Sequence, residues 1–166
     1  MPEFEHERHK PPTQLSEPRP LVLVLAPLRS NVNLSRIVRL AGCAGIRKII
    51  QCGPGRVDPE IARDAIDVVE IVHRNSIAPV LEQLGREGFQ RVGLEQTTNS
   101  KSIFEFEFPK QTALVIGNER QGLADDALSK LDHVVEIPVY GKPFSYNVAT
   151  ATTMAVYEYC RQFPFG

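Results

Sequence analysis

The sequence predicts an α/β domain with a mostly parallel β-sheet flanked by helices. Apolar runs of strand length alternate along the chain with segments whose apolar residues recur at helical spacing, an alternation typical of βαβ units. The first run, residues 21–26, is apolar throughout, which is the pattern of a strand covered on both faces of a sheet. Polar clusters follow several of these runs, as expected where parallel strands end at a binding edge.

One globular domain accounts for the length and composition. The chain has 166 residues, of which 42% are hydrophobic and 23% charged, and this is enough for a single sizeable core. Residues 1–20 differ because they hold five prolines and four glutamates and show almost no apolar periodicity. We therefore expect a disordered, mobile tail at residues 1–20 and a folded domain at residues 21–166.

A helix follows the strand at residues 21–26. Asn31 or Asn33 can cap its start, and Gly45 can end it. Its core-facing positions recur at helical spacing: Leu34, Ile37, Val38 and Ala41. Arg39 falls outside this apolar stripe, so we expect it on the surface of the helix.

The remaining elements continue the alternation. We expect further strands at residues 48–52, 68–72, 91–95, 113–116 and 134–137. We expect further helices at residues 59–67, 76–87, 123–131 and 146–163. The turn at residues 53–55 lacks the Lys-Ser/Thr ending of a phosphate-binding P-loop. Residues 96–102 form a polar loop in which Thr97 and Thr98 can approach a ligand.

The sequence also bounds the compartment and the chemistry. It contains no run of 18 apolar residues and no charged-then-apolar leader with a small-residue cleavage site, so we expect a cytoplasmic protein. Its three cysteines are odd in number and widely spaced, and its four histidines form no ligand pair with them. This spacing argues against a zinc site or a disulfide framework, and we expect no metal.

The charge of the chain does not by itself favour RNA binding. Its formal net charge is −1, whereas proteins that bind RNA phosphates generally show a basic surface. A net charge can still hide a local patch. Five basic residues crowd into one stretch without Asp or Glu: Arg29, Arg36, Arg39, Arg47 and Lys48. Ordinary surface charge and a phosphate-binding patch are both compatible with this stretch.

Three polar clusters stand out, at residues 31–41, 115–123 and 137–150. Each follows a predicted strand, so all three are expected at the carboxyl edge of the sheet, where ligands bind in such folds. Each polar side chain also has an ordinary structural interpretation as a helix cap, a solvated acid or a surface charge. The positions concerned are Asn33, Arg39, Glu119, Ser145 and Asn147.

Three chemistries suit a polar cluster above a parallel sheet: dinucleotide redox, phosphoryl transfer and methyl transfer. The chain lacks Gly-x-Gly-x-x-Gly after its first strand, and it lacks both a P-loop and a paired acidic metal site. Methyl transfer from S-adenosylmethionine requires less, because the protein has only to hold the cofactor, orient a nucleophile and help remove its proton. Phe144 and Tyr146 can wall such a pocket.

The three clusters resemble, in order and spacing, the motifs of the SpoU class of SPOUT RNA 2′-O-ribose methyltransferases. Asn33 and Arg39 match the Asn and Arg of the first motif. Residues 117–123 match the second motif, and residues 137–138 with the Ser-x-Asn at residues 145–147 match the third. The resemblance covers about residues 21–163.

The resemblance implies a deep trefoil knot from about Ala113 onward and a homodimer that binds S-adenosylmethionine in the knot. The implied catalytic residues are Asn33, Arg39, Glu119, Ser145 and Asn147. The implied cofactor-binding residues are Leu94, Ile116, Gly117, Asn118, Ile137, Tyr146 and Asn147. Two positions depart from the family pattern. The family often has Gly where this chain has Ser35, and Leu where it has Tyr146.

In the family the first-motif Arg is proposed as the general base on the ribose 2′-hydroxyl. A free guanidinium keeps its proton far above neutral pH. A positively charged Arg39 that stabilises the developing alkoxide is therefore physically easier. Glu119 and Ser145 are expected to hold Arg39 or the substrate in place.

The resemblance also bears on the partners. Residues 94–102 and the compact architecture are most similar to the branch that methylates a guanosine ribose in the tRNA D-loop, with ribosomal RNA as the runner-up. A non-catalytic RNA-binding or assembly protein on the same fold is the alternative from another class. We expect a homodimer in which Arg39 enters the partner's site. The small-residue surface expected to pack in it comprises Val148, Ala151, Thr152, Ala155, Val156 and Tyr159.

Overall fold

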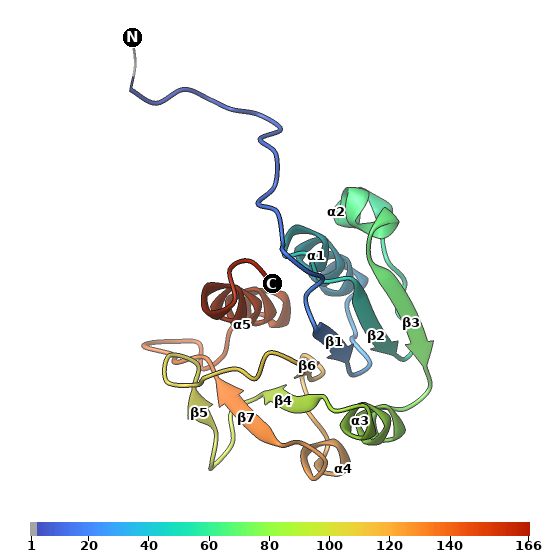
Figure 1. The fold of residues 1–166 in the computed structure, drawn as a ribbon. Helices are drawn as coiled ribbons and strands as arrows, with labels where there is room; N and C mark the ends of the chain where they lie inside the picture. Colours follow the sequence, from blue (N-terminus) through green and yellow to red (C-terminus); the bar gives the residue numbers. More distant parts are fainter. Residues whose placement is uncertain (1–2) are drawn as a thin grey trace.

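The computed structural model describes residues 3–166, and Figure 1 traces their path. The strands are β1 (Leu21–Leu25), β2 (Lys48–Cys52), β3 (Glu70–Arg74), β4 (Gln90–Leu94), β5 (Lys101–Ser102), β6 (Thr112–Ile116) and β7 (His133–Glu136). The helices are α1 (Asn31–Cys43), α2 (Pro59–Ala62), α3 (Ile77–Arg86), α4 (Asp125–Leu128) and α5 (Val148–Gln162), with a 3₁₀ turn, η1 (Arg63–Asp67). The predicted alternation of strands and helices is confirmed.

The strands form one seven-stranded sheet in the order β3-β2-β1-β6-β4-β7-β5. Every pairing between its strands is parallel, so the predicted fold class, a mostly parallel sheet flanked by helices, is confirmed. Strand β6 lies between β1 and β4, although β4 precedes it in the sequence. The loops that leave β4, β6 and β7 therefore emerge side by side at one edge of the sheet.

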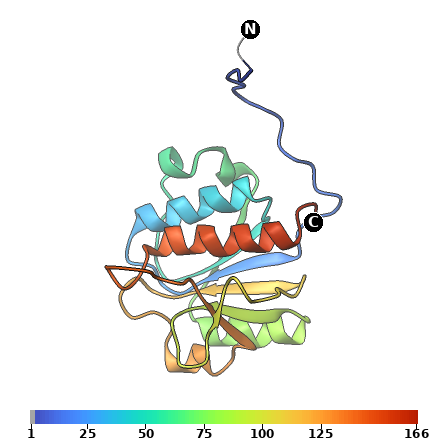
Figure 2. The same cartoon turned by 90° about the vertical axis from the view of Figure 1, so that its left-hand side faces the viewer.

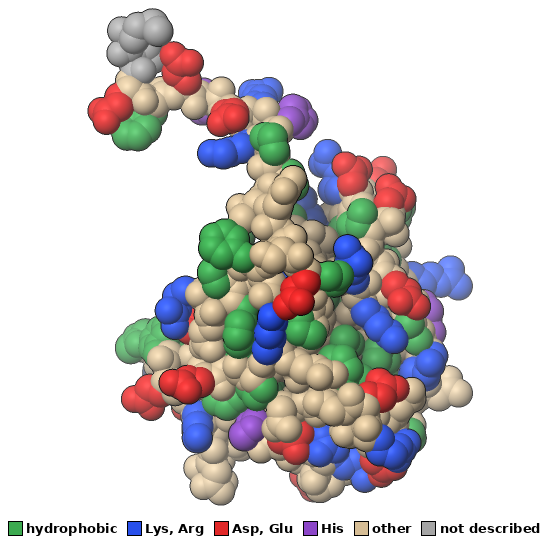
Figure 3. All heavy atoms as spheres, viewed as in Figure 1, with side chains coloured by type: hydrophobic (Ala, Val, Ile, Leu, Met, Phe, Trp, Pro, Cys, Tyr) green, Lys and Arg blue, Asp and Glu red, His purple; other side chains and the backbone are tan. Residues whose placement is uncertain are grey.

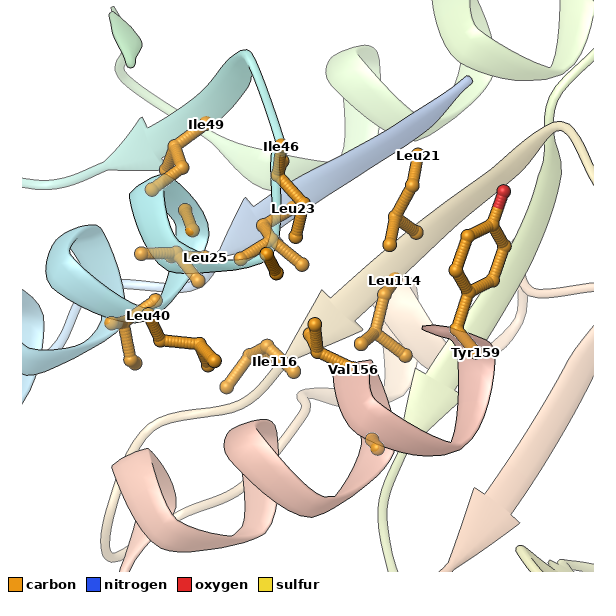
Figure 4. Close-up of a cluster of buried hydrophobic side chains, with 14 of the residues drawn as sticks. Leu21, Leu23, Leu25, Leu40, Ile46, Ile49, Leu114, Ile116, Val156 and Tyr159 are labelled. Carbon is orange, nitrogen blue, oxygen red and sulfur yellow. The ribbon is translucent and has the colours of Figure 1, made fainter. Parts of the chain in front are cut away.

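The apolar residues of β1 alternate between two cores. Leu21, Leu23 and Leu25 belong to one cluster, which includes side chains of α1 and α5. Figure 4 shows this cluster, with Val156 and Tyr159 of α5 facing the leucines of β1. Val22 and Val24 of β1 belong to the second cluster, which includes side chains of α3 and α4. Both faces of β1 are covered, which explains its continuous apolar run.

Helices α1 and α5 lie side by side on one face of the sheet, and α3 and α4 cover the other (Figure 2). This arrangement contradicts the prediction that the small-residue surface of α5 packs against a second chain. Thr152, Ala155, Val156 and Tyr159 are buried in the chain's own core, so they cannot form a contact with a second chain. The outward face of α5 instead carries Thr150, Thr153 and Tyr157.

Several predicted boundaries were wrong. The N-cap of α1 is Ser30, whose Oγ accepts a hydrogen bond from the Asn33 N–H at 3.1 Å, rather than Asn31 or Asn33. The predicted helix at residues 59–67 divides at Arg63, which has a left-handed φ of 57° and cannot continue an α-helix.

The second half of the chain shows two further differences. The predicted helix at residues 123–131 shrinks to α4, because Ala124 before it is extended and Asp132 after it donates its backbone N–H to the Arg91 carbonyl. The polar loop at residues 96–102 ends in the short strand β5, which pairs with β7. Strand β3 begins two residues later than the predicted strand at residues 68–72.

The segment before β1 makes contacts with the body of the protein. Arg19 is buried, and its Nε donates to the Ala44 carbonyl at 2.8 Å. The Ser16 N–H donates to the Phe165 carbonyl at 2.8 Å. Residues 3–14 are exposed and extend away from the sheet (Figure 1). The mobility expected for residues 1–20 stays a prediction, and residues 1–2 lie outside the described residues. Among residues 3–166, no helix combines the length and apolar character that crossing a membrane requires.

Candidate active site

A pocket of about 450 Å³ lies at the edge of the sheet where β4, β6 and β7 end. Its walls come from the three loops that leave these strands, together with the first turns of α1 and α5. All but one of the predicted site residues line it: Asn33, Leu94, Ile116, Gly117, Asn118, Glu119, Ile137, Ser145, Tyr146 and Asn147. Residues from four separate parts of the chain therefore share one cavity.

The loop after β6 is folded tightly against itself. Asn118 and Gly122 exchange two backbone hydrogen bonds, at 3.0 and 2.9 Å. The Asn118 side chain accepts from the backbone N–H of Arg120 at 2.9 Å and donates to the Pro27 carbonyl at 2.7 Å. A Cβ on Gly117 would lie 2.5 Å from the Gly122 carbonyl carbon. Only glycine at residue 117 permits this close approach.

This turn directs the Glu119 carboxylate toward the start of α1. The carboxylate accepts from the backbone N–H groups of Arg29 at 2.9 Å and Ser30 at 3.0 Å, and from Asn33 Nδ2 at 3.3 Å. Burial would raise the pKa of Glu119, but these donors stabilise the ionised form and hold its pKa below the usual value. Glu119 therefore is an anion that fixes the loop between β1 and α1.

Asn33 connects Glu119 to the start of α5. Its side chain is buried, and its Oδ1 accepts a hydrogen bond from Asn147 Nδ2 at 3.1 Å. The Asn147 Oδ1 in turn accepts from the N–H groups of Ala149 at 2.9 Å and Thr150 at 3.3 Å, so Asn147 is the N-cap of α5. One hydrogen-bonded chain, Glu119–Asn33–Asn147, thus joins the three polar clusters of the sequence.

Sequence reasoning missed two carboxylates in the pocket wall, Glu95 and Glu136. Glu95 accepts from the backbone N–H groups of Leu123 at 3.0 Å and Gln96 at 3.1 Å, and so ties the β4 loop to the β6 loop. Glu136 accepts from Ser100 Oγ at 2.9 Å. Each lies at the carboxyl end of a strand, and this position could have identified both as candidate site residues. The two carboxylates favour a ligand group with positive charge at this wall.

The sequence profile described as the SpoU rRNA Methylase family matches residues 20–157. The chain belongs to this family. The Glu119–Asn33–Asn147 chain consequently links residues of all three SpoU motifs, and the pocket is where these motifs meet.

Comparison with known proteins agrees with this assignment. The chain is 30% identical over 149 residues to the tRNA (guanosine(18)-2′-O)-methyltransferase TARBP1 of Mus musculus, a match covering 86% of this chain. It spans only 9% of that relative's length.

Solved structures of related enzymes share the fold. The Aquifex aeolicus TrmH/SpoU tRNA modifying enzyme superimposes with a TM-score of 0.83 at 27% identity, over 88% of this chain and 76% of that one. The AdoMet-bound rRNA methyltransferase from Sinorhizobium meliloti superimposes with a TM-score of 0.75 at 26% identity, over 89% of this chain and 57% of that one.

Arg39 of the first SpoU motif is the predicted site residue that does not line the pocket. It is exposed on α1, six residues beyond Asn33. At 100° per residue, six residues place Arg39 about 120° around the helix from Asn33. The same separation places it about 9 Å further along the helix axis. The cation that lines the pocket of this chain is Arg120.

Of the two aromatic residues expected to wall the pocket, only one lines it. Tyr146 lines the pocket, as predicted, and its side chain is 44% exposed. The prediction that Phe144 walls the pocket was wrong, because this side chain is 75% exposed and is not among the residues that line the pocket. Thr97 and Thr98 do not line the pocket either, since Thr97 forms a local turn with Ser100.

In the described part of the chain, no three His, Cys, Asp or Glu side chains come together as a metal site would require. The free cysteines are buried at Cys52, half-buried at Cys160 and exposed at Cys43. Burial raises the pKa of both the Cys52 and the Cys160 thiols, so these two are poor nucleophiles at neutral pH.

Proposed function

We propose that this chain is an S-adenosylmethionine-dependent RNA 2′-O-ribose methyltransferase that acts on a tRNA guanosine ribose. The observation that carries the proposal is the Glu119–Asn33–Asn147 chain, which brings residues of all three SpoU motifs to one pocket. The relatives named for tRNA guanosine 2′-O-methylation and the AdoMet-bound neighbour support it. Because the proposed substrate is RNA, we propose the cytoplasm as the compartment.

The residues of the pocket fit the proposed cofactor. The volume of about 450 Å³ lies within the range of small-molecule sites. Leu94, Ile116 and Ile137 provide an apolar wall for an adenine ring, and their loops bring backbone groups to its edge. Glu95 and Glu136 complement the positive charges of the sulfonium and the amino group. S-adenosylmethionine supplies an activated methyl group, so the protein has only to position the acceptor and remove its proton.

Arg39 is the proposed stabiliser of the developing alkoxide on the ribose 2′-oxygen. Because it faces away from the pocket of its own chain, we propose that it acts in the pocket of a partner, within a homodimer. The outward stripe of α1 carries Val32, Arg36, Arg39 and Cys43, all exposed. Helix α1 lies beside α5 on the same face of the sheet, so a second copy packed over these two helices would bring Arg39 close to another chain.

Three further features belong to this proposal. Family membership implies the trefoil knot from about Ala113 onward. The basic residues Arg29, Arg36 and Lys48 are exposed, and we propose that they contact RNA phosphates, which position the RNA without reading its sequence. The ribose 2′-hydroxyl distinguishes RNA from DNA, and a single-stranded loop presents it without opening a duplex.

The decisive experiment incubates the purified protein with unmodified total RNA and labelled S-adenosylmethionine and maps the label by mass spectrometry. We expect label on a tRNA guanosine ribose, with the D-loop as its site. Label on ribosomal RNA alone would refute the tRNA assignment and make ribosomal RNA the substrate, as the name of the Sinorhizobium meliloti neighbour states for that protein. A folded protein that binds RNA but neither S-adenosylmethionine nor S-adenosylhomocysteine would instead be a non-catalytic RNA-binding protein.

A further inference from the structure

The loop between β7 and α5 exposes large aromatic side chains. Tyr140 is 85% exposed and Phe144 is 75% exposed. In Figure 1 this loop projects from the body at the left, and Figure 3 shows hydrophobic side chains standing out at the same edge. Two large aromatic side chains left in water on one short loop offer apolar surface to a partner.

This aromatic surface adjoins the pocket. Val139, Ser145 and Tyr146 line the cavity, so Tyr140 and Phe144 each follow or precede a lining residue by one position. The Phe144 carbonyl accepts a hydrogen bond from Gln96 Nε2 at 3.1 Å, which ties the loop to the β4 loop of the pocket. A Cβ added at Gly141 would meet nothing within 4 Å. The tip of the loop therefore stands in open space while its base is anchored at the cavity.

Positive charge accompanies the rings. Lys142 Nζ lies 6.0 Å from the centre of the Phe144 ring, within the range of a cation–π contact. Arg120, which is exposed, lines the pocket from the β6 loop. Exposed aromatic faces interleaved with cations match a nucleotide, in which a flat base is joined to a phosphate. A purely apolar protein partner would offer these cations no counter-charge.

We propose that Tyr140 and Phe144 form a stacking surface for an unpaired nucleobase of the RNA, adjacent to the methylated ribose. The inference rests on the proposed function and names how the RNA is held beside the pocket. Stacking does not distinguish one base from another, because every base has an aromatic face. The surface therefore contributes affinity and orientation to a splayed, single-stranded nucleotide, and Lys142 contributes a contact to its phosphate.

The test compares the double variant Tyr140→Ala/Phe144→Ala with Tyr140→Trp/Phe144→Trp and with the control Phe165→Ala. Phe165 is an aromatic residue of similar exposure, 59%, beyond the other end of α5. We expect the alanine pair to raise the KM for RNA roughly 10- to 100-fold and to leave the Kd for S-adenosylmethionine unchanged. The tryptophan pair should retain RNA affinity, and Phe165→Ala should behave as the wild type.

Direct binding of a single-stranded oligoribonucleotide separates this inference from the proposed function. Weaker binding by the alanine pair in a protein that methylates no RNA would sustain the stacking surface and refute the activity. Normal RNA binding by the alanine pair in an active enzyme would refute the stacking surface alone. Sedimentation is the remaining control, because an alanine pair that dissociates a dimer would make the loop a contact between two copies and overturn the proposal.

Discussion

Glu119→Gln tests the hydrogen-bonded chain, Glu119–Asn33–Asn147, that joins the three polar clusters at the pocket. In the wild type one carboxylate oxygen accepts from the Ser30 N–H and Asn33 Nδ2, and the other accepts from the Arg29 N–H. Glutamine keeps one acceptor oxygen and places an NH₂ donor against the Arg29 N–H. A hydrogen bond to a charged group contributes about 1.5–3 kcal/mol. With one such bond lost at a partly exposed position, we expect the free energy of unfolding to fall by about 2 kcal/mol.

The pH dependence of this loss has a definite sign. The folded-state pKa of Glu119 lies below its ordinary value of 4.5, so the carboxylate stabilises the fold above the unfolded-state pKa. That contribution is lost as the pH falls through the folded-state pKa. The difference in unfolding free energy between wild type and Glu119→Gln should therefore be full at neutral pH and shrink once the pH drops below 4.5.

Urea unfolding at pH 7 and at about pH 3.5 measures both quantities. Protein concentration is held fixed, because a dimer would make stability depend on it. The matched control is Glu105→Gln, an exposed glutamate, which should change stability by less than about 0.5 kcal/mol. A Glu119→Gln variant as stable as this control at pH 7, or a deficit that does not change with pH, would refute the reasoning.

Three other variants test separate parts of the site. Asn147→Ala should lower stability by about 1 kcal/mol because it removes the N-cap of α5; Asn147→Ser should restore stability in thermal unfolding but not methylation, since a serine cannot reach Asn33. Arg39→Ala should abolish methylation with little change in the Kd for S-adenosylmethionine, and mixing it with inactive Asn33→Ala chains should restore activity if Arg39 acts across a dimer. Arg36→Ala should weaken binding of all RNAs alike and lower the slope of log affinity against log salt by about 1, whereas a loss confined to one RNA would contradict a phosphate contact.

The strands and the polar clusters were predictable from local sequence. A continuous apolar run such as β1 has one stable environment, between two covered faces of a sheet. Gly117 and Asn147 lie where the chain must turn or a helix must begin, and both requirements are written in a few neighbouring residues. Local patterns therefore identified the elements and the polar clusters, whereas the resemblance to the SpoU motifs identified the residues among them that line the pocket.

The packing of these elements depended on contacts between distant parts of the chain. Asn33 and Asn147 are 114 positions apart, and no local pattern pairs them. Tyr157 and Tyr159 lie two residues apart on α5, yet one is 61% exposed and the other fully buried, because burial depends on which side of the helix meets the sheet. The same dependence turned Arg39 away from the pocket and brought Glu95 into it. Sequence determined where each element lies along the chain, whereas the strand order β3-β2-β1-β6-β4-β7-β5 decided which residues meet, since side chains become neighbours only when the sheet is assembled.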